Sequence, residues 1–358
     1  MDSRQTAILL TAGLYATPNG KTAHGLVRGP SRFRILAIVD PAGAGHDAGE
    51  LLDGRRRDIP VVATIEDAFA AAGRPDFAVV GIATHGGVIT PDLRERLREA
   101  IGAGLGVVNG LHTFVSEDPE LAELAARRGV EIVDVRKPKP RSALRFWTGE
   151  IQTVSAPRIA VLGTDCALGK RTTCQAAAAA CRAEGIRAEI VYTGQTGWLQ
   201  GIRHGFILDS TVNDFVSGEL EGAILDCDRE ASPDVIFLEG QSALRNPSGP
   251  CGAELLLSGG AHGVFLQHAP ERRYFDGAEE FGYAIPSVAS EMELIRFYDA
   301  RVLAVTLNDS GLGAATREAA RSLVEREAGV PAVYPLDPEG ASALVPIVRA
   351  YIESERRP

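Results

Sequence analysis

The chain has 358 residues, more than twice the size of a typical domain, so its length predicts two domains. Apolar residues make up 45% and charged residues 23%, a balance that is typical of globular proteins and excludes wholesale disorder. Lys and Arg total 37 against 47 Asp and Glu, and the net charge of −10 argues against nonspecific binding to nucleic acid or to an anionic membrane.

Three further features bear on the cellular compartment. No apolar run approaches 18 residues, the length that a membrane span needs. Residues 1–5 lead directly into a strand-like segment and lack the build of a signal peptide. The five cysteines are an odd number and scattered, which favours reduced thiols over a disulfide framework or a structural zinc site. We therefore expect a cytoplasmic protein with reduced thiols and no structural zinc site.

The first part of the chain alternates short β-branched segments with helical ones. The predicted strands span residues 6–14, 33–40, 59–63, 77–83, 106–109 and 131–135, and the predicted helices span residues 65–72, 91–102 and 119–128. This alternation predicts a parallel, doubly wound α/β sheet. Pro138 and Pro140 then break the pattern in the manner of a semi-rigid linker. We assign residues 1–140 to a Rossmann-like domain and residues 141–358 to a second domain.

The loop after the first predicted strand lacks the glycines of a dinucleotide site. The G-x-G-x-x-G pattern lets the backbone approach a pyrophosphate, but only Gly13 lies near a required position, and Pro18 interrupts the expected helix start. Asp40 has the position of a ribose-binding acid, and without the fingerprint we interpret it as a turn residue. We therefore do not predict NAD binding. The loops at residues 84–87 and 109–112 are either ligand loops or simple glycine turns.

Strand–helix alternation resumes at residue 158. The predicted strands span residues 159–162, 188–192, 235–238, 263–267, 302–306 and 332–334, and the predicted helices span residues 170–184, 291–298, 314–328 and 340–353. This half is again predicted to be an α/β domain.

The first predicted strand and helix of this half enclose the sharpest signal in the chain. A hydrophobic strand runs into a glycine-bounded loop that ends in Gly169-Lys170, and an alanine-rich helix follows at once. This is the context of a P-loop, in which backbone N–H groups and the helix N-terminus hold a phosphate and the lysine neutralises it. The expected ligand-binding residues are Gly163, Thr164, Asp165, Cys166, Ala167, Leu168, Gly169, Lys170, Arg171, Thr172 and Thr173.

This loop departs from the common P-loop pattern in two ways. Five residues separate Gly163 from Gly169, which resembles the dethiobiotin-synthetase-like branch of P-loop proteins with its G-T-D-x-x-x-G-K-T loop. Arg171 stands where Ser or Thr normally supplies a hydroxyl to Mg²⁺, and a guanidinium offers hydrogen-bond donors but cannot ligate a cation. Thr172 and Thr173 are alternative ligands at a different angle on the helix. We therefore predict phosphate binding and leave Mg²⁺ open.

Other polar residues of this half are further candidates. Glu239, at the end of a predicted strand, begins a Glu-Gly-Gln segment that resembles the Glu-Gly motif facing the phosphate loop in the same branch. Asp214 opens a helix and either caps it or faces the ligand, while residues 193–198 follow a strand and could line the cleft. His262 and His268 flank a strand, and each is either catalytic or structural. Residues 271–274 offer guanidinium groups for an anion or are a solvated charge run.

The loop from Gly163 to Thr173, the segment Glu239-Gly240-Gln241 and residues 81–87 together resemble a known bacterial family. It is a two-domain P-loop family catalogued as a domain of unknown function and often mislabelled NAD-dependent epimerase/dehydratase. The resemblance covers about residues 6–350, and the loop pattern G-T-D-C-A-x-G-K-x-T-T matches throughout. Some members are D-glutamate N-acetyltransferases. The resemblance therefore implies transfer of acetyl from acetyl-CoA, as co-substrate, to the amine of an acidic amino acid such as D-glutamate.

Acetylation of an amine needs a base for the ammonium group and a hydrogen-bond donor for the acyl oxygen. Glu239 or Asp214 is the candidate base, and His262 or Gln241 is the candidate donor, while Lys170 and Arg171 would hold the phosphates of CoA. We expect a small amino-acid substrate, a homo-oligomer, and neither nucleic acid nor membrane as partner. Two alternatives stay open: an ATP- and Mg²⁺-dependent kinase or ligase that activates a carboxylate, and a non-catalytic sensor of CoA or nucleotide.

Overall fold

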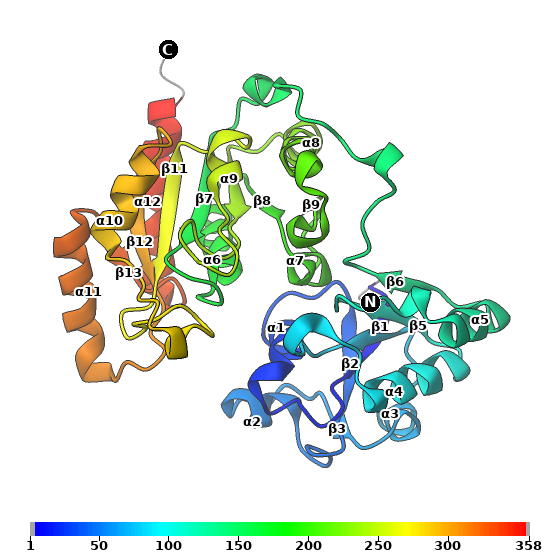
Figure 1. The fold of residues 1–358 in the computed structure, drawn as a ribbon. Helices are drawn as coiled ribbons and strands as arrows, with labels where there is room; N and C mark the ends of the chain where they lie inside the picture. Colours follow the sequence, from blue (N-terminus) through cyan, green and yellow to red (C-terminus); the bar gives the residue numbers. More distant parts are fainter. Residues whose placement is uncertain (1–3, 356–358) are drawn as a thin grey trace. The chain divides into compact units, whose positions relative to one another are not determined.

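The computed structural model describes residues 4–355 and divides the chain into two compact units (Figure 1). The first unit runs to Pro138 and also includes Gln195–Ile202, whereas the second contains Lys139–Gly194 and the residues from Arg203 onwards. The boundary predicted from the sequence lies after residue 140. The excursion of Gln195–Ile202 into the first unit is not evident from the sequence pattern.

The first unit is built on a six-stranded parallel sheet with the order β3-β2-β1-β4-β5-β6. This is the strand order of the Rossmann fold, and it confirms the predicted Rossmann-like domain. The strands are β1 (Thr6–Leu10), β2 (Arg34–Val39), β3 (Val61–Val62), β4 (Phe77–Val80), β5 (Gly106–Asn109) and β6 (Ile132–Asp134). The helices that connect them are α1 (Lys21–Arg28), α2 (Ala48–Asp53), α3 (Ile65–Ala72), α4 (Pro91–Gly102) and α5 (Pro119–Arg128).

Helices α3, α4 and α5 have the bounds predicted from the sequence. Capping residues in the sequence mark where each of these helices begins. Thr64 and Asp67 form a reciprocal capping box at the start of α3. Thr90 and Asp118 accept backbone hydrogen bonds at the starts of α4 and α5, each of which has proline at its first position.

The structure corrects the sequence reading of the first loop. Strand β1 ends at Leu10 rather than Leu14, because the backbone turns through left-handed conformations at Ala12 and Gly13. Pro18 opens a 3₁₀ turn, and α1 follows directly at Lys21, so the proline shifts the helix start without abolishing the helix. Helices α1 and α2 are short and were not predicted.

Residues Gln195–Ile202 belong to the first unit although they lie in the second half of the sequence. They contain the short helix α7 (Gln195–Leu199). Leu199 is fully buried in the core of the first unit. The guanidinium of Arg32 lies 4.2 Å from the ring centre of Trp198 and donates a hydrogen bond to the carbonyl oxygen of Trp198 at 2.9 Å. The predicted cleft segment 193–198 is therefore divided, since Thr193 and Gly194 stay in the second unit.

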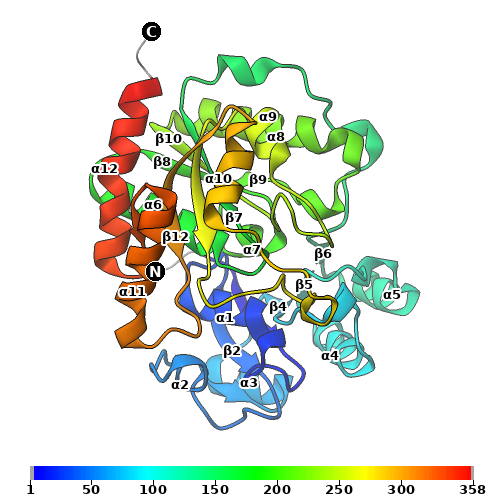
Figure 2. The same ribbon diagram turned by 60° about the vertical axis from the view of Figure 1, so that its left-hand side comes forward.

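The second unit contains a seven-stranded parallel sheet with the order β13-β12-β11-β7-β10-β8-β9. Its strands are β7 (Arg158–Gly163), β8 (Ala188–Tyr192), β9 (His204–Gly205), β10 (Val235–Glu239), β11 (Gly263–His268), β12 (Arg301–Leu307) and β13 (Ala332–Val333). Its helices are α6 (Lys170–Ala183), α8 (Asn213–Ala231), α9 (Ala253–Leu257), α10 (Val288–Arg296), α11 (Ala314–Ala328) and α12 (Pro338–Glu355). Right-handed crossovers place α6 on one face of the sheet and α8–α11 on the other. The C-terminal helix α12 packs against α6 and lies at the outer side of the unit in Figure 2.

Two buried carboxylates on α8 hold the segment that enters the second unit. Glu219 accepts hydrogen bonds from Lys139 Nζ at 2.6 Å and from the backbone N–H of Arg145 at 2.9 Å. Glu221 accepts from the backbone N–H groups of Thr148 at 2.7 Å and Ile151 at 3.0 Å. Glu219 and Glu221 are therefore satisfied although they are only 4% and 2% exposed.

We expect Glu221→Ala to lower the free energy of unfolding by about 3 kcal/mol, because it leaves the backbone N–H groups of Thr148 and Ile151 without an acceptor. Denaturant unfolding measures this change. Glu230→Ala on the same helix is the control, since the ion pair of Glu230 with Arg203 is exposed and should contribute less than about 1 kcal/mol. Equal losses for the two variants would contradict the role given to Glu221.

Candidate functional site

The loop between β7 and α6 has the form of a phosphate cradle. Ala167 and Gly169 adopt left-handed conformations, with φ of 52° and 101°, and so bend the backbone around the start of α6. The N-cap residue of α6 is Gly169, which has no side chain to bond the N–H groups of the first turn. This geometry supports the phosphate-binding function predicted for the loop.

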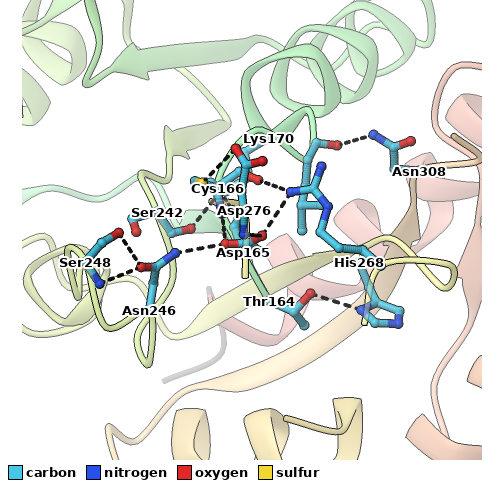
Figure 3. A network of polar contacts seen from close by, with 12 residues as sticks. Thr164, Asp165, Cys166, Lys170, Ser242, Asn246, Ser248, His268, Asp276 and Asn308 are labelled. Carbon is cyan, nitrogen blue, oxygen red and sulfur yellow. Dashed lines mark hydrogen bonds and ion pairs between the residues drawn. The ribbon is translucent and has the colours of Figure 1, made fainter. Parts of the chain in front are cut away.

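Lys170 is held at the centre of this loop. Its side chain crosses Gly163, where an added Cβ would lie 3.2 Å from Nζ. Nζ donates hydrogen bonds to the carbonyl oxygens of Asp165 and Ser242, both at 2.7 Å (Figure 3). Lys170 is 6% exposed, and burial lowers its pKa to about 8. The ammonium group is thus positioned by backbone dipoles rather than by a carboxylate.

Asp165 fastens the loop to its surroundings, as Figure 3 shows. Its fully buried carboxylate accepts four hydrogen bonds, from the backbone N–H groups of Cys166 at 2.7 Å and Asp276 at 2.8 Å, and from Asn246 Nδ2 and Arg272 Nη1, both at 2.9 Å. The sequence prediction placed Asp165 among the ligand-binding residues. Its carboxylate instead forms hydrogen bonds that hold the loop in place. The guanidinium of Arg272 forms an ion pair with this carboxylate.

Two threonines of the loop segment also bond to the protein. Thr164 Oγ1 lies 3.0 Å from His268 Nδ1, and Thr173 Oγ1 donates to Gln267 Oε1 at 2.6 Å. Thr173 is 1% exposed, whereas Thr172 is exposed on the first turn of α6. Of the two threonines that could replace the missing Mg²⁺ hydroxyl, only Thr172 therefore has an exposed side chain.

A second buried charge, Glu239, lies beside the loop at the end of β10. Its Oε1 is 3.6 Å from Arg171 Nη1, and its Oε2 accepts the backbone N–H of Thr193 at 3.2 Å. Burial raises the pKa of Glu239, and the charge of Arg171 partly offsets that rise. Gln241 Nε2 donates to Thr193 Oγ1 at 2.9 Å. The structure therefore brings together three predicted residues from different elements: Arg171, Glu239 and Gln241.

The other two predicted catalytic residues, His262 and Asp214, are exposed. His262 is exposed and precedes β11, whose Gly263 pairs with Ile159 near the start of β7, so it lies at the opposite edge of the sheet. A strand of six residues separates the two edges by about 20 Å. Asp214 is exposed in the first turn of α8 and does not cap it, since the N-cap is Val212. We therefore withdraw His262 and prefer Glu239 over Asp214 as the base.

The histidine that does lie at the loop is His268, at the end of β11. Burial lowers its pKa to about 4, so its imidazole is neutral near pH 7. The sequence could have distinguished the two histidines, because residues that end a parallel strand lie at the ligand edge of the sheet and residues that precede it do not.

The usual dinucleotide site of the first unit is occupied by protein contacts. The carboxylate of Asp40 accepts hydrogen bonds from Thr11 Oγ1, from the backbone N–H of Tyr15 and from that of Gly43, as expected of a turn residue. The backbone N–H of Ala23, in the first turn of α1, donates to the carbonyl oxygen of Gly81 at 2.8 Å. A helix N–H group that would face a pyrophosphate is thus already paired.

Among residues 4–355, no three His, Cys, Asp or Glu side chains are grouped so that they could hold a metal ion. The helices of the same range are all too short or too polar to cross a membrane. The five cysteines are free.

Comparisons with known proteins connect both units to one family. Residues 41–138 match the Rossmann-like domain DUF1611_N, and residues 145–345 match the P-loop domain DUF1611_C, both described as domains of unknown function. A DUF1611 family protein from Anabaena variabilis ATCC 29413 has a crystal structure similar to this one, with a TM-score of 0.87 and 28% identity, covering 97% of this chain and all of that chain.

Two curated relatives carry the name D-glutamate N-acetyltransferase. The protein from Tritonibacter scottomollicae is 30% identical over 294 residues, which are 80% of this chain and 84% of the relative. The protein from Pseudoalteromonas sp is 28% identical over 275 residues, 75% of this chain and 79% of the relative.

The pKa of Lys170 predicts how phosphate binding varies with pH. Burial lowers this pKa to about 8 in the free protein, and a bound anion would favour the charged form. We therefore expect the affinity for inorganic pyrophosphate to be constant below pH 8 and to fall about tenfold per pH unit above it. Isothermal titration calorimetry between pH 7 and pH 9.5 measures this profile.

Lys170→Arg is the control for this profile, because a guanidinium stays charged throughout the range. The variant should bind more weakly at pH 7 and lose the fall above pH 8. A flat profile for the unaltered protein would show that Lys170 does not bind the anion.

Proposed function

This chain belongs to the DUF1611 family, and from that premise we propose that it is an N-acetyltransferase that moves acetyl from acetyl-CoA to the amine of D-glutamate or a closely related acidic amino acid. The observation that carries the proposal is the pairing of Glu239 with Arg171 beside the phosphate loop. It provides a buried carboxylate at the point where a phosphate-bearing co-substrate would end. The names of the two relatives suggest the acyl group and the acceptor.

The phosphate loop would anchor CoA by its pyrophosphate. The N–H groups of the loop and of the first turn of α6 donate to phosphate oxygens, and Lys170 and Arg171 neutralise the charge. Neither contact requires hydrolysis or a metal ion. Because Arg171 occupies the position of the usual Mg²⁺ hydroxyl, this loop is better suited to holding a phosphate than to breaking one.

The chemical step needs a base and an acyl-oxygen donor. The carboxylate of Glu239 takes a proton from the substrate ammonium, and its raised pKa makes it a stronger base than an exposed glutamate. The amine nitrogen then attacks the thioester carbonyl carbon, and Gln241 donates to the oxygen that gains charge. When the C–S bond breaks, the thiolate takes the second proton of the nitrogen, so that CoA leaves as the thiol and Glu239 returns its proton to water.

The activity is tested by incubating the purified protein with acetyl-CoA and D-glutamate. We expect N-acetyl-D-glutamate by mass spectrometry and one free thiol for each product. L-glutamate and D-aspartate define the acceptor, and ATP with Mg²⁺ tests the kinase or ligase alternative. Release of ADP without an acetylated product would overturn the proposal in favour of that alternative.

Glu239→Gln tests the assignment of the base. The variant keeps the size and hydrogen bonding of the side chain but cannot take a proton, so kcat/KM should fall about 100-fold or more. The decrease in kcat/KM at low pH that comes from protonating Glu239 should disappear with it. His262→Ala is the control and should leave the rate unchanged, since His262 lies at the far edge of the sheet. An active Glu239→Gln variant would remove Glu239 as the base.

A further inference from the structure

A hairpin that follows β11, residues 272–285, is attached to the phosphate loop and is not used by the mechanism above. Its two arms pair where the backbone N–H of Ile285 donates to the carbonyl oxygen of Arg273 at 2.9 Å. At its base, Arg272 Nη1 and the backbone N–H of Asp276 donate to the carboxylate of Asp165 at 2.9 Å and 2.8 Å. Figure 3 shows Asp276 beside Asp165. The residues between these two anchor points are therefore held next to the loop.

Arg273 lies between the two anchor points, and its side chain is exposed. Its guanidinium lies 5.1 Å from the ring centre of Tyr274, a favourable contact that helps to position it. Tyr274 is itself held by the bridge that it forms with Ala284 across the hairpin. Within the described part of the chain, residues 4–355, Arg273 forms no ion pair with a carboxylate. Its charge is therefore available to an anionic ligand.

Other arginines at this edge of the sheet differ from Arg273, because a carboxylate already pairs with each of them. Their N–O distances run from 2.6 to 3.6 Å in the pairs Arg171–Glu239, Arg245–Glu291, Arg272–Asp165 and Arg317–Asp337. The acids nearest to Arg273 in the sequence have other contacts. Asp276 Oδ2 lies 3.5 Å from Cys166 Sγ, and Glu271 Cβ lies 3.5 Å from where Gly311 would carry a Cβ. Arg273 therefore has no ion-pair partner among residues 4–355 to release before it binds a ligand.

We propose that Arg273 binds the 3′-phosphate of CoA, a group that no residue of the mechanism above contacts. The inference rests on the proposed function, because the choice of this phosphate follows from acetyl-CoA as the co-substrate. A guanidinium binds a phosphate through two parallel charge-assisted hydrogen bonds. Arg273 is then a specificity-determining residue, which distinguishes CoA from diphosphate carriers that lack the additional phosphate.

The strand order decides which anion Arg273 meets. In the sheet, β11 lies on one side of β7 and β10 lies on the other, and the ends of β11 and β10 are about 10 Å apart. The diphosphate lies on the loop after β7, and the thioester must reach Glu239 at the end of β10. The opposite end of CoA therefore lies on the β11 side, where Arg273 is, and the charged group of that end is the 3′-phosphate.

A carboxylate of the amino-acid acceptor fits this place less well. The amine of the acceptor must lie at Glu239 to lose its proton, so its carboxylates lie on the β10 side of the loop. The hairpin that carries Arg273 starts from β11 on the other side. The observations thus favour the phosphate monoester over the carboxylate as the anion that Arg273 binds.

The test compares CoA with dephospho-CoA, which lacks only the 3′-phosphate. Calorimetry gives both dissociation constants, and the unaltered protein should bind CoA at least about tenfold more tightly. Arg273→Gln should weaken CoA to the level of dephospho-CoA while changing the affinity for dephospho-CoA less than about twofold. Arg273→Lys keeps the charge without the fork of donors, so its preference for CoA should lie between the two.

Arg296→Gln is the matched control. Arg296 is also an exposed arginine, but it ends α10, where the chain returns to the start of β12 at the opposite edge of the sheet. It should leave both affinities unchanged. The inference is overturned if Arg273→Gln keeps the preference for CoA, or if the unaltered protein binds both ligands equally. A higher KM for D-glutamate in Arg273→Gln with an unchanged preference for CoA would overturn it in favour of the acceptor carboxylate.

The binding result is independent of the acetylation assay. A preference for CoA that Arg273→Gln abolishes, in a protein without acetyltransferase activity, supports the role of Arg273 and contradicts the proposed function. Acetylation that uses acetyl-CoA and its dephospho form equally well supports the proposed function and contradicts the role of Arg273. A protein that binds neither CoA nor dephospho-CoA would contradict both.

Discussion

The buried carboxylate of Asp165 is the contact on which the phosphate site depends. It joins the loop after β7 to Asn246 in the loop after β10 and to Arg272 and Asp276 in the loop after β11. All three loops leave the same edge of a parallel sheet, where ligands of such folds bind. One side chain thus fixes the shape of a loop whose backbone N–H groups are the donors to phosphate in the proposed function.

The charges of Lys170 and Glu239 are not cancelled by tight ion pairs. Lys170 is bound by two carbonyl oxygens and Glu239 by a backbone N–H, while the ion pair between Arg171 and Glu239 is 3.6 Å long. Groups that are held by dipoles keep much of their capacity to interact with a ligand charge, whereas tight ion pairs would have to be broken first. The two pKa shifts have the same cause. Burial disfavours the charged form of each group, and so it raises the pKa of Glu239 and lowers that of Lys170.

Local signals in the sequence were sufficient for much of the fold and for the centre of the site. Helices α3, α4 and α5 follow from capping residues and proline, and the phosphate loop follows from a short motif between a strand and a helix. The sequence does not predict the contacts of the Asp165 carboxylate, because three of its four partners lie 81 to 111 positions away and such contacts leave no local pattern. The same applies to Glu219 and Glu221, whose burial in α8 depends on contacts with residues 70 and 74 positions upstream.

Arg171 stands where a phosphate loop usually carries Ser or Thr, and this bears on what the loop can hold. A Ser or Thr hydroxyl at this position and an acid at the end of the neighbouring strand would together hold Mg²⁺. Here the position carries a guanidinium, and that guanidinium lies against the acid, Glu239. In the proposed mechanism the pair supplies a cation for phosphate and a carboxylate for proton transfer in place of two potential metal ligands. Such a loop would hold a phosphate-bearing carrier while the other end of that carrier reacts.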